Sequence, residues 1–461
     1  MCGIFGILNG STDVAAKIVK GLACLQHRGQ ESAGICIANK DSLEHDKDLG
    51  LVSYVAREGR WGGMRGCRGI GHVRYSTKGS TTKDNAGPML ASSPIGSIAV
   101  SYNGNLINAN FLRAKLAGHG FDFVTTTDTE IIVKTISFHL RQENSLVDAV
   151  RASMEELSGA YSLLVLSNDE MIAVRDPNGF RPLCLGEFGG GFVVSSETCA
   201  LKTAEAKFIR EIENGEIVSI SDNGISSFQG PKSRRAMCIF EFIYVARPDS
   251  RIYGKNMYGC RYNCGISLAK EDQESGNTGI AVPMLNTGGP AGLGFGWAKG
   301  LQTHTAVVKD RYDPLRTFIK PNQDDRSSGV DAFSTIDDTL NQEKVFIVDD
   351  SIVRGTTKAG IVAKLRQAGA REVHVRIASP PYRFPCYFGV DTATKEELIA
   401  SSRSVKEIES HIGADSLRYL SLEGMYEAIG LPREMFCDGC LTNNYPLEIP
   451  EETHLTKLSL G

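Results

Sequence analysis

Two acids and a short run of hydroxyl-bearing residues follow an apolar stretch in the last third of the chain. Residues 345–348 are apolar and strand-forming, and they lead directly into Asp349, Asp350, Ser351, Arg354, Gly355, Thr356 and Thr357. Adjacent carboxylates can accept hydrogen bonds from two neighbouring hydroxyls of a ribose ring. Free backbone N–H groups, hydroxyls and an arginine suit a phosphate group. The loop therefore predicts a site for a ribose 5-phosphate.

The elements on either side of this loop decide where it lies. Residues 345–348 predict a buried strand, and a helix follows in which Ile361, Leu365 and Ala368 share one face. Residues 373–379 predict the next strand, which completes a βαβ unit. Ligands bind at the carboxyl ends of strands in open parallel sheets, where this loop would lie. A strand followed by two acids also occurs in receiver domains and metal-dependent phosphatases, and acids at strand ends are often helix caps.

A cysteine at the second position could carry out a different reaction. Aminopeptidases remove an initiator methionine before a small residue, and removal of Met1 would leave Cys2 with both a thiol and an α-amine. The pKa of such an amine is about 8, so the amine can act as the base for the thiol beside it. The alternative is a buried cysteine at the start of an edge strand.

Length and composition place the chain among ordinary globular proteins. It has 461 residues, enough for two or three domains, with 41% apolar and 23% charged residues. A net charge of −4 gives no reason to expect nucleic acid or an anionic membrane as a partner. The chain has neither an apolar run of membrane-spanning length nor the pattern of a signal peptide, so we expect a cytoplasmic protein.

Several motifs in the first half support a catalytic interpretation of Cys2. These motifs are residues 25–31, 71–77, 102–106 and 126–130. Together with the Cys-Gly-Ile start, they resemble the motifs of class II glutamine amidotransferase domains. The histidines in the first two motifs, His27 and His72, are interpreted as structural because that family does not use them as bases.

The resemblance implies a role for each matching residue. Cys2 attacks the side-chain amide of glutamine, which releases ammonia. Arg74 pairs with the α-carboxylate of glutamine, a task suited to a bidentate guanidinium, and Asp128 accepts from its α-ammonium. Asn103 and the backbone N–H of Gly104 form the oxyanion hole.

The second half carries a further resemblance. The loop at 345–357 resembles the phosphoribosyl-diphosphate (PRPP) motif of type I phosphoribosyltransferases, and residues 238–250 resemble the segment joining the two halves of amidophosphoribosyltransferases. Members of that family make phosphoribosylamine from glutamine and PRPP at the entry to purine synthesis. The resemblance implies Mg²⁺ on the diphosphate, purine nucleotides as inhibitors and a homotetramer. It also implies a flexible loop that closes over PRPP, with Lys309, Arg311, Tyr312 and Arg316.

Four of the twelve cysteines match a ligand set in some members of that family. Cys437 and Cys440 form a C-x-x-C pair, which by itself could be half of a zinc site, a redox pair or two unrelated thiols. The resemblance adds Cys238 and Cys386 and implies a [4Fe–4S] cluster held by the four thiolates. Zinc in the same four-cysteine cage is the alternative.

Two segments depart from the pattern of that family. Its pyrophosphate loop has an acid after Val-Pro, whereas Met284 follows Val282 and Pro283 here. Asp331 and Ala332 stand where basic residues usually lie, which bears on inhibition by nucleotides. The alternatives are a divergent paralogue that aminates another phosphorylated sugar, and a ribose-phosphate-sensing regulator without transfer activity.

The sequence therefore predicts an enzyme with two domains. Residues 2–231 are expected to form a layered αββα sandwich of the N-terminal-nucleophile type. Residues 232–461 are expected to form a type I phosphoribosyltransferase domain on a parallel sheet, with a cysteine-ligated terminal segment.

Overall fold

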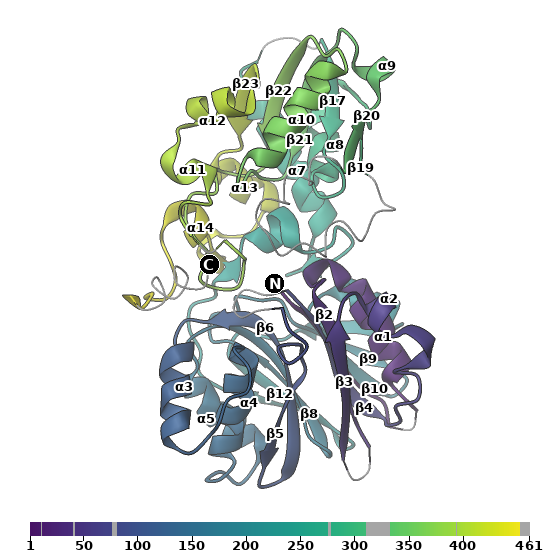
Figure 1. Cartoon of the computed structure of the whole chain (residues 1–461), viewed down its shortest axis with the longest axis vertical. Coiled ribbons are helices and arrows are strands. Elements are labelled where there is room, and N and C mark those ends of the chain that lie inside the picture. Colours follow the sequence, from purple (N-terminus) through teal and green to yellow (C-terminus); the bar gives the residue numbers. More distant parts are fainter. Residues whose placement is uncertain are drawn as a thin grey trace.

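The computed structural model describes residues 1–10, 12–39, 42–75, 81–274, 278–309, 332–392 and 394–451. Figure 1 shows two bodies stacked along the long axis of the molecule. One contains the antiparallel sheets of the first half, and the other contains the sheet and helices of the second half. The N-terminus lies between the two bodies, which places Cys2 near both of them.

The first sheet is antiparallel and begins with the strand that follows Cys2. Its seven strands run in the order β11-β9-β10-β1-β4-β2-β3. Every residue of β1 is buried, because one face of the sheet packs on a second sheet and the other on helices. The strands are β1 (Gly3–Leu8), β2 (Ser32–Ala38), β3 (Leu43–Leu49), β4 (Arg68–Arg74), β9 (Cys184–Phe188), β10 (Gly191–Ser195) and β11 (Lys207–Glu211).

The second sheet has six antiparallel strands in the order β13-β12-β8-β7-β6-β5. An apolar layer lies between the two sheets, with Ile4 and Ile70 from the first and Leu164 and Met171 from the second. The strands are β5 (Met89–Ser93), β6 (Gly96–Leu106), β7 (Gly159–Leu166), β8 (Glu170–Arg175), β12 (Glu216–Ser221) and β13 (Gly224–Gln229).

Helices cover the outer face of each sheet. The first sheet is covered by α1 (Ala15–Cys24), α2 (Val52–Val55) and α6 (Thr198–Thr203), with the short 3₁₀ turns η1 (Gln26–Arg28) and η2 (Arg57–Gly59). The second sheet is covered by α3 (Ala109–Gly118), α4 (Asp128–His139) and α5 (Leu146–Glu156). The predicted αββα layering is confirmed.

The second half is built on a parallel sheet with the order β18-β17-β21-β22-β23. Its strands are β17 (Ile280–Pro283), β18 (Gln302–Thr303), β21 (Lys344–Asp349), β22 (Glu372–Ile377) and β23 (Ser416–Tyr419). One face packs against α7 (Met257–Glu271), α8 (Gly289–Lys299) and α13 (Leu422–Ile429), and the other against α10 (Thr356–Gln367) and α12 (Val405–Ile412). The βαβ unit predicted around the acidic loop is confirmed as β21-α10-β22.

Short elements complete the second half. They include the π-helix η3 (Glu241–Val245), β15 (Arg251–Ile252), β16 (Lys255–Asn256), β19 (Val307–Lys309), β20 (Phe333–Thr335), α9 (Asp337–Leu340), α11 (Ile399–Ser402), η5 (Arg433–Met435) and α14 (Gly439–Thr442). Strand β14 (Met237–Cys238) pairs in parallel with β24 (Phe436–Cys437). The domain boundary expected at residue 231 falls between β13 and β14. In the part of the chain that the structure describes, every helix is too short or too polar to cross a membrane.

Helices α7 and α8 approach each other closely at two glycines. A Cβ at Gly265 would lie 1.9 Å from the carbonyl oxygen of Ala291, and one at Gly294 would lie 2.0 Å from that of Tyr262. These are backbone atoms of the facing helix, so a side chain larger than hydrogen would push the helices apart. Because α8 contacts β17 and β21, this packing supports the strands that lead into the acidic loop.

We expect Gly265→Ala to destabilise the second half by about 1–3 kcal/mol, because overpacking shifts the backbone of α8. Gly259→Ala is the matched control on the same helix, since a Cβ there meets only Asn256 Oδ1 at 3.9 Å. The control should be neutral, or more stable by up to about 1 kcal/mol from helix propensity. Thermal unfolding of the two variants side by side measures the difference, and equal midpoints would contradict the packing argument.

Candidate active site

Cys2 lies just before β1, the central strand of the first sheet, next to the end of β4 and the last part of β6. Its backbone N–H donates to Asn103 Oδ1 at 3.1 Å, and its Sγ lies 3.6 Å from the carbonyl oxygen of Tyr75. Asn103 is fully buried, and its Nδ2 has no hydrogen-bond partner among the described residues. Buried donors are nearly always satisfied, so an unpaired one next to a thiol is suited to a charge that appears only during reaction.

Gly104 follows Asn103 on β6 and lies opposite Tyr161 on β7. A Cβ at Gly104 would lie 1.9 Å from the carbonyl oxygen of Ala160, which leaves room only for glycine. The close strand pairing therefore sets the backbone of Gly104 beside Asn103. The two residues predicted for the oxyanion hole lie together, and their role stays a prediction.

The two residues expected to bind glutamine come from different layers. Gly3 pairs with Val73, so Cys2 and Arg74 lie next to each other at the edge of the sheet. Arg74 is buried, and one of its guanidinium nitrogens lies 3.8 Å from Glu31. Asp128 begins α4 on the outer side of the second sheet, and its Oδ2 accepts from the backbone N–H of Leu106 at the end of β6.

The two histidines of the motifs have structural surroundings. Burial, with Arg74 adding to it, lowers the pKa of His72 to about 3, so the ring is neutral at pH 7. A Cβ at Gly87 would lie 2.4 Å from the Nδ1 of this ring, so the loop at Gly87 packs directly on it. His27 Nε2 lies 2.7 Å from Glu197 Oε1 in a buried network.

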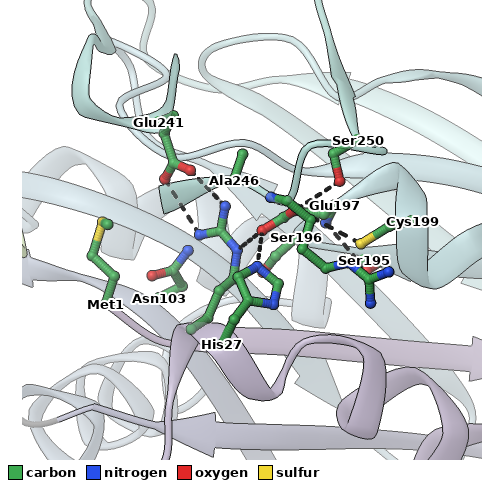
Figure 2. A network of polar contacts seen from close by, with 12 residues as sticks. Met1, His27, Asn103, Ser195, Ser196, Glu197, Cys199, Glu241, Ala246 and Ser250 are labelled. Carbon is green, nitrogen blue, oxygen red and sulfur yellow. Dashed lines mark hydrogen bonds and ion pairs between the residues drawn. The ribbon is translucent and has the colours of Figure 1, made fainter. Parts of the chain in front are cut away.

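That network joins the two halves of the chain (Figure 2). Arg28 contacts two carboxylates, Glu197 of the first half and Glu241 of η3, and all three side chains are fully buried. Glu197 Oε2 also accepts from the Ser250 hydroxyl at 2.6 Å and from the backbone N–H of Arg247 at 2.9 Å. Burial opposes ionisation of Glu197, but Arg28 and His27 hold its pKa well below the usual range.

Further contacts between the halves lie close to the chain start. Arg181 contacts the Met1 side chain and lies 3.5 Å from Glu241, and its guanidinium also donates to the carbonyl oxygen of Phe388. The Tyr75 hydroxyl lies 3.5 Å from Asp391 Oδ2. The segment that carries the thiol site is therefore held against residues 388–391 of the second half.

The acidic loop lies at the carboxyl end of β21, as predicted, and its two acids have internal partners. Asp349 Oδ1 accepts from the Asp350 N–H at 2.8 Å, and Oδ2 forms a buried ion pair with Lys358. Asp350 Oδ1 accepts from the Ser351 hydroxyl at 2.6 Å, and burial raises the pKa of the Asp350 carboxyl. Sequence reasoning missed Lys358, although it shares the inward face of α10 with Ile361 and Leu365.

The segment after β17 packs against the same acids. A Cβ at Gly288 would lie 2.7 Å from Asp349 Oδ1. Met284 is buried in the apolar core beneath the sheet, and its N–H donates to the carbonyl oxygen of Val348 at 2.8 Å. The methionine that replaces the expected acid therefore serves as core packing.

The other end of the loop forms the start of α10. Gly355 has a φ of +85°, which favours glycine, and a Cβ there would lie 2.5 Å from Ile399. Thr356 and Thr357 are the first exposed residues of the helix, whose first N–H groups have no partner within it. Arg354 is exposed and pairs with Glu397 at 2.8 Å. These features leave backbone donors available to an anion.

The four cysteines singled out by the sequence come from three segments that meet. Cys238 lies opposite Cys437 in the β14–β24 pair, and the N–H groups of residues 383 and 384 donate to the carbonyl oxygen of Cys440. Cys386 follows in that segment, and all four side chains are buried. Burial raises the pKa of Cys437 and Cys440, and the neighbouring thiols add to the shift. Within the described ranges, no group of three or more His, Cys, Asp or Glu residues has the geometry of a metal-ion site.

The predicted flexible loop is only partly described. Lys309 ends β19, while Arg311, Tyr312 and Arg316 lie outside the described residues. Asp331 also lies outside them, and its neighbour Ala332 is half-buried at the start of the next described segment.

Comparison with known proteins covers the chain almost from end to end. A family described as a glutamine amidotransferase domain matches residues 72–203. The amidophosphoribosyltransferase of Methanocaldococcus jannaschii is 42% identical over 97% of this chain and 98% of that protein. The Bacillus subtilis amidophosphoribosyltransferase is 42% identical over 98% of this chain and 96% of that protein. A solved structure of the B. subtilis glutamine PRPP amidotransferase complexed with ADP and GMP matches with a TM-score of 0.91 at 40% identity, over 98% of this chain and 100% of that chain.

We expect the buried Asp349–Lys358 pair to behave as a unit. Lys358→Met leaves the carboxylate without its cation and should cost about 3 kcal/mol of unfolding free energy. Adding Asp349→Asn removes that unpaired charge. The loss of unfolding free energy in the double variant should therefore be smaller, by at least about 1 kcal/mol, than the sum of the losses in the two single variants. Urea unfolding of the two single variants and the double variant measures this coupling.

Arg366→Met is the matched control on the same helix. Arg366 pairs with Asp415 at 2.8 Å, but the two side chains are 36% and 37% exposed. Loss of such a surface pair should cost less than about 1 kcal/mol. Strict additivity of the Asp349 and Lys358 substitutions would show that the two side chains are not paired in solution.

Proposed function

The chain belongs to the amidophosphoribosyltransferase family, and we propose that it hydrolyses glutamine at Cys2 and transfers the ammonia to C1 of PRPP. The products would be phosphoribosylamine, glutamate and pyrophosphate. The observation that carries this proposal is the full-length match, in which both halves of the chain align with enzymes of this activity. The arrangement around Cys2 and the acidic loop supports it residue by residue.

At the glutaminase site, Asn103 would serve two purposes. Once Met1 is removed, the Cys2 nitrogen that bonds to Asn103 Oδ1 becomes the α-amine. The pKa of an α-amine is about 8, so the freed Cys2 amine can take the proton of the thiol beside it. The thiolate attacks the glutamine carbonyl carbon. The unpaired Nδ2 of Asn103 and the N–H of Gly104 then stabilise the oxyanion.

The following steps release ammonia. Collapse of the tetrahedral intermediate breaks the C–N bond, ammonia leaves with the transferred proton, and water hydrolyses the glutamyl thioester to glutamate. Arg74 would hold the α-carboxylate of glutamine, and Asp128 its α-ammonium. Arg181 donates to the carbonyl oxygen of Phe388, which holds this site next to the second half, where C1 of PRPP would receive the ammonia.

At the transferase site, Asp349 and Asp350 would accept hydrogen bonds from the two ribose hydroxyls. Lys358 pairs with Asp349 Oδ2 and would have to move from it when a hydroxyl takes its place. Ser351, Arg354, Gly355, Thr356 and Thr357 would hold the 5-phosphate at the start of α10. Ammonia attacks C1, and the C1–O bond to pyrophosphate breaks, so catalysis depends mainly on positioning.

Several further features are proposed by resemblance to the family. Mg²⁺ would bind the diphosphate mainly through substrate oxygens and water. Lys309, Arg311, Tyr312 and Arg316 would cover bound PRPP. Purine nucleotides are proposed as inhibitors because the B. subtilis relative is described as complexed with ADP and GMP. A homotetramer is proposed on the same ground of family membership.

We also propose a [4Fe–4S] cluster held by Cys238, Cys386, Cys437 and Cys440. Four buried cysteines from three converging segments supply the donor set that such a cluster requires. The group would tie the terminal segment to the rest of the second half without any redox step in catalysis. Zinc remains the alternative for the same thiols.

The activity is tested by measuring pyrophosphate and glutamate together under anaerobic conditions, with glutamine, PRPP and Mg²⁺. We expect near-equal amounts of the two products. Cys2→Ala should abolish the glutamine-dependent reaction, because the nucleophile is lost, and retain activity with free ammonia. Glutamate without pyrophosphate would instead indicate another phosphorylated sugar as acceptor, and loss of both activities in Cys2→Ala would contradict two separate sites.

Metal content tests the proposed cluster independently of activity. Protein purified without oxygen should be brown and contain about four irons per chain. Cys437→Ser should lose iron, whereas Cys260→Ser, at a buried cysteine on α7, should retain it. A colourless protein loaded with zinc would refute the iron–sulfur proposal.

A further inference from the structure

Two thiols outside the proposed cluster and the Cys2 site lie against each other between α1 and α6. Cys24 ends α1 and Cys199 lies in the first turn of α6, and both helices pack on the outer face of the first sheet. Their side chains interact directly, and both cysteines are free thiols. Neither residue has a role in the glutamine or PRPP chemistry described above.

The surroundings of the two thiols differ in charge. Arg247 Nη1 donates to Cys24 Sγ at 3.2 Å and to the Cys24 carbonyl oxygen at 3.3 Å. Cys199 Sγ donates to Glu197 Oε2 at 3.6 Å. The Arg247 guanidinium, which also pairs with Asp249, therefore faces Cys24, and the Glu197 carboxylate faces Cys199. This arrangement favours a thiolate at Cys24 and a protonated thiol at Cys199.

The pKa directions agree with these contacts. The neighbouring Cys199 thiol lowers the pKa of Cys24 against the opposing effect of burial; Thr203 and Arg247 add to the lowering, and Asp249 opposes it. The same pairing raises the pKa of Cys199, together with burial and the Glu197 carboxylate. Of the two thiols, Cys24 is therefore the one that loses its proton more readily.

Access is also unequal. The exposed fraction is 9% for Cys24 and 3% for Cys199, and the Arg247 side chain next to Cys24 is 39% exposed. Cys24 is therefore the more accessible of the two thiols.

We propose that Cys24 and Cys199 form a redox-sensitive dithiol that a hydroperoxide converts to a disulfide. The Cys24 thiolate attacks the peroxide O–O bond and becomes a sulfenic acid, while hydroxide leaves. The Cys199 sulfur then attacks the Cys24 sulfur, and the sulfenic oxygen leaves as water together with the Cys199 proton. With hydrogen peroxide, the hydroxide takes up the proton that Cys24 had released, so each sulfur loses one electron and the peroxide oxygens end as two waters.

The disulfide would alter a contact between the halves of the chain. It removes the anionic acceptor of Arg247, whose backbone N–H binds Glu197. Cys24 is also followed directly by Leu25 and by Arg28 of the buried network. Leu25 packs against Gly3, where a Cβ would lie 2.9 Å from the Leu25 Cβ. We therefore expect oxidation to shift residues 24–28, which pack next to Gly3 and Cys2. That this shift would affect the glutaminase reaction rests on the proposed function.

The experiment treats the anaerobically purified full-length protein with hydrogen peroxide near pH 7, blocks remaining thiols and maps peptides by mass spectrometry. We expect a reducible Cys24–Cys199 cross-linked peptide to form about threefold or more faster than oxidation of Cys67, a half-exposed thiol used as reference. Peptide mapping detects the Cys24–Cys199 cross-link directly, so oxidation of Cys2 or of the cluster cysteines does not affect the measurement.

Three variants test the assigned roles. Cys199→Ser should let a sulfenic acid on Cys24 accumulate and be trapped by dimedone, whereas Cys24→Ser should leave Cys199 unmodified. Arg247→Ala should slow the cross-linking, because the thiolate loses its cation. Failure to find the cross-link in folded wild-type protein, while Cys67 is oxidised, would overturn the proposal. That outcome would leave the glutaminase and transferase assignments intact, since these are measured through glutamate and pyrophosphate.

Discussion

The arrangement of the two halves depends on a buried arginine placed between two carboxylates. Arg28, Glu197 and Glu241 have no exposed side-chain surface, and the desolvation of three charges is tolerable only if each is paired. Arg181 adds a second cation beside Glu241 and is likewise fully buried. The four side chains thus balance in charge, with two arginines and two glutamates. Loss of one partner would leave an uncompensated charge in the interior.

This network also determines what lies behind the nucleophile. Arg28 belongs to the short turn η1 that follows α1, and Leu25 before it packs against Gly3. Arg181 contacts Met1 on one side and the carbonyl oxygen of Phe388 on the other. Cys2 therefore lies where both halves of the chain meet. An ammonia-producing site gains from this position, because its product is released toward the half that uses it.

The acidic loop follows a related principle on a smaller scale. Asp349 pairs with Lys358, and Arg354 pairs with Glu397. The site thus contains its own counterions, and a ribose phosphate would exchange these internal partners for its hydroxyls and phosphate. Met284 fits the same picture, since its side chain packs in the core and adds no negative charge near the expected diphosphate.

Much of the architecture was predictable from the sequence because it depends on short-range patterns. The spacing of apolar residues along the chain predicted three buried features: the run before Asp349, the face of α10 with Ile361 and Leu365, and the strand that follows. Motif residues singled out Cys2, Asn103 and Asp128, whose roles stay predictions, and several such motifs together indicated the amidophosphoribosyltransferase family, to which the chain belongs. The predicted fold of both halves was confirmed.

The partners of the charged residues were decided only by the tertiary structure. Arg28 and Glu241 are 213 positions apart, and no local pattern relates them. Lys358 was not singled out in the sequence, and its partner became apparent only where β21 places Asp349 against it. The pairing of Cys24 with Cys199 likewise requires α1 and α6 to pack on one sheet. Spacing along the chain predicts which residues are buried, but which charges meet there depends on how distant elements pack.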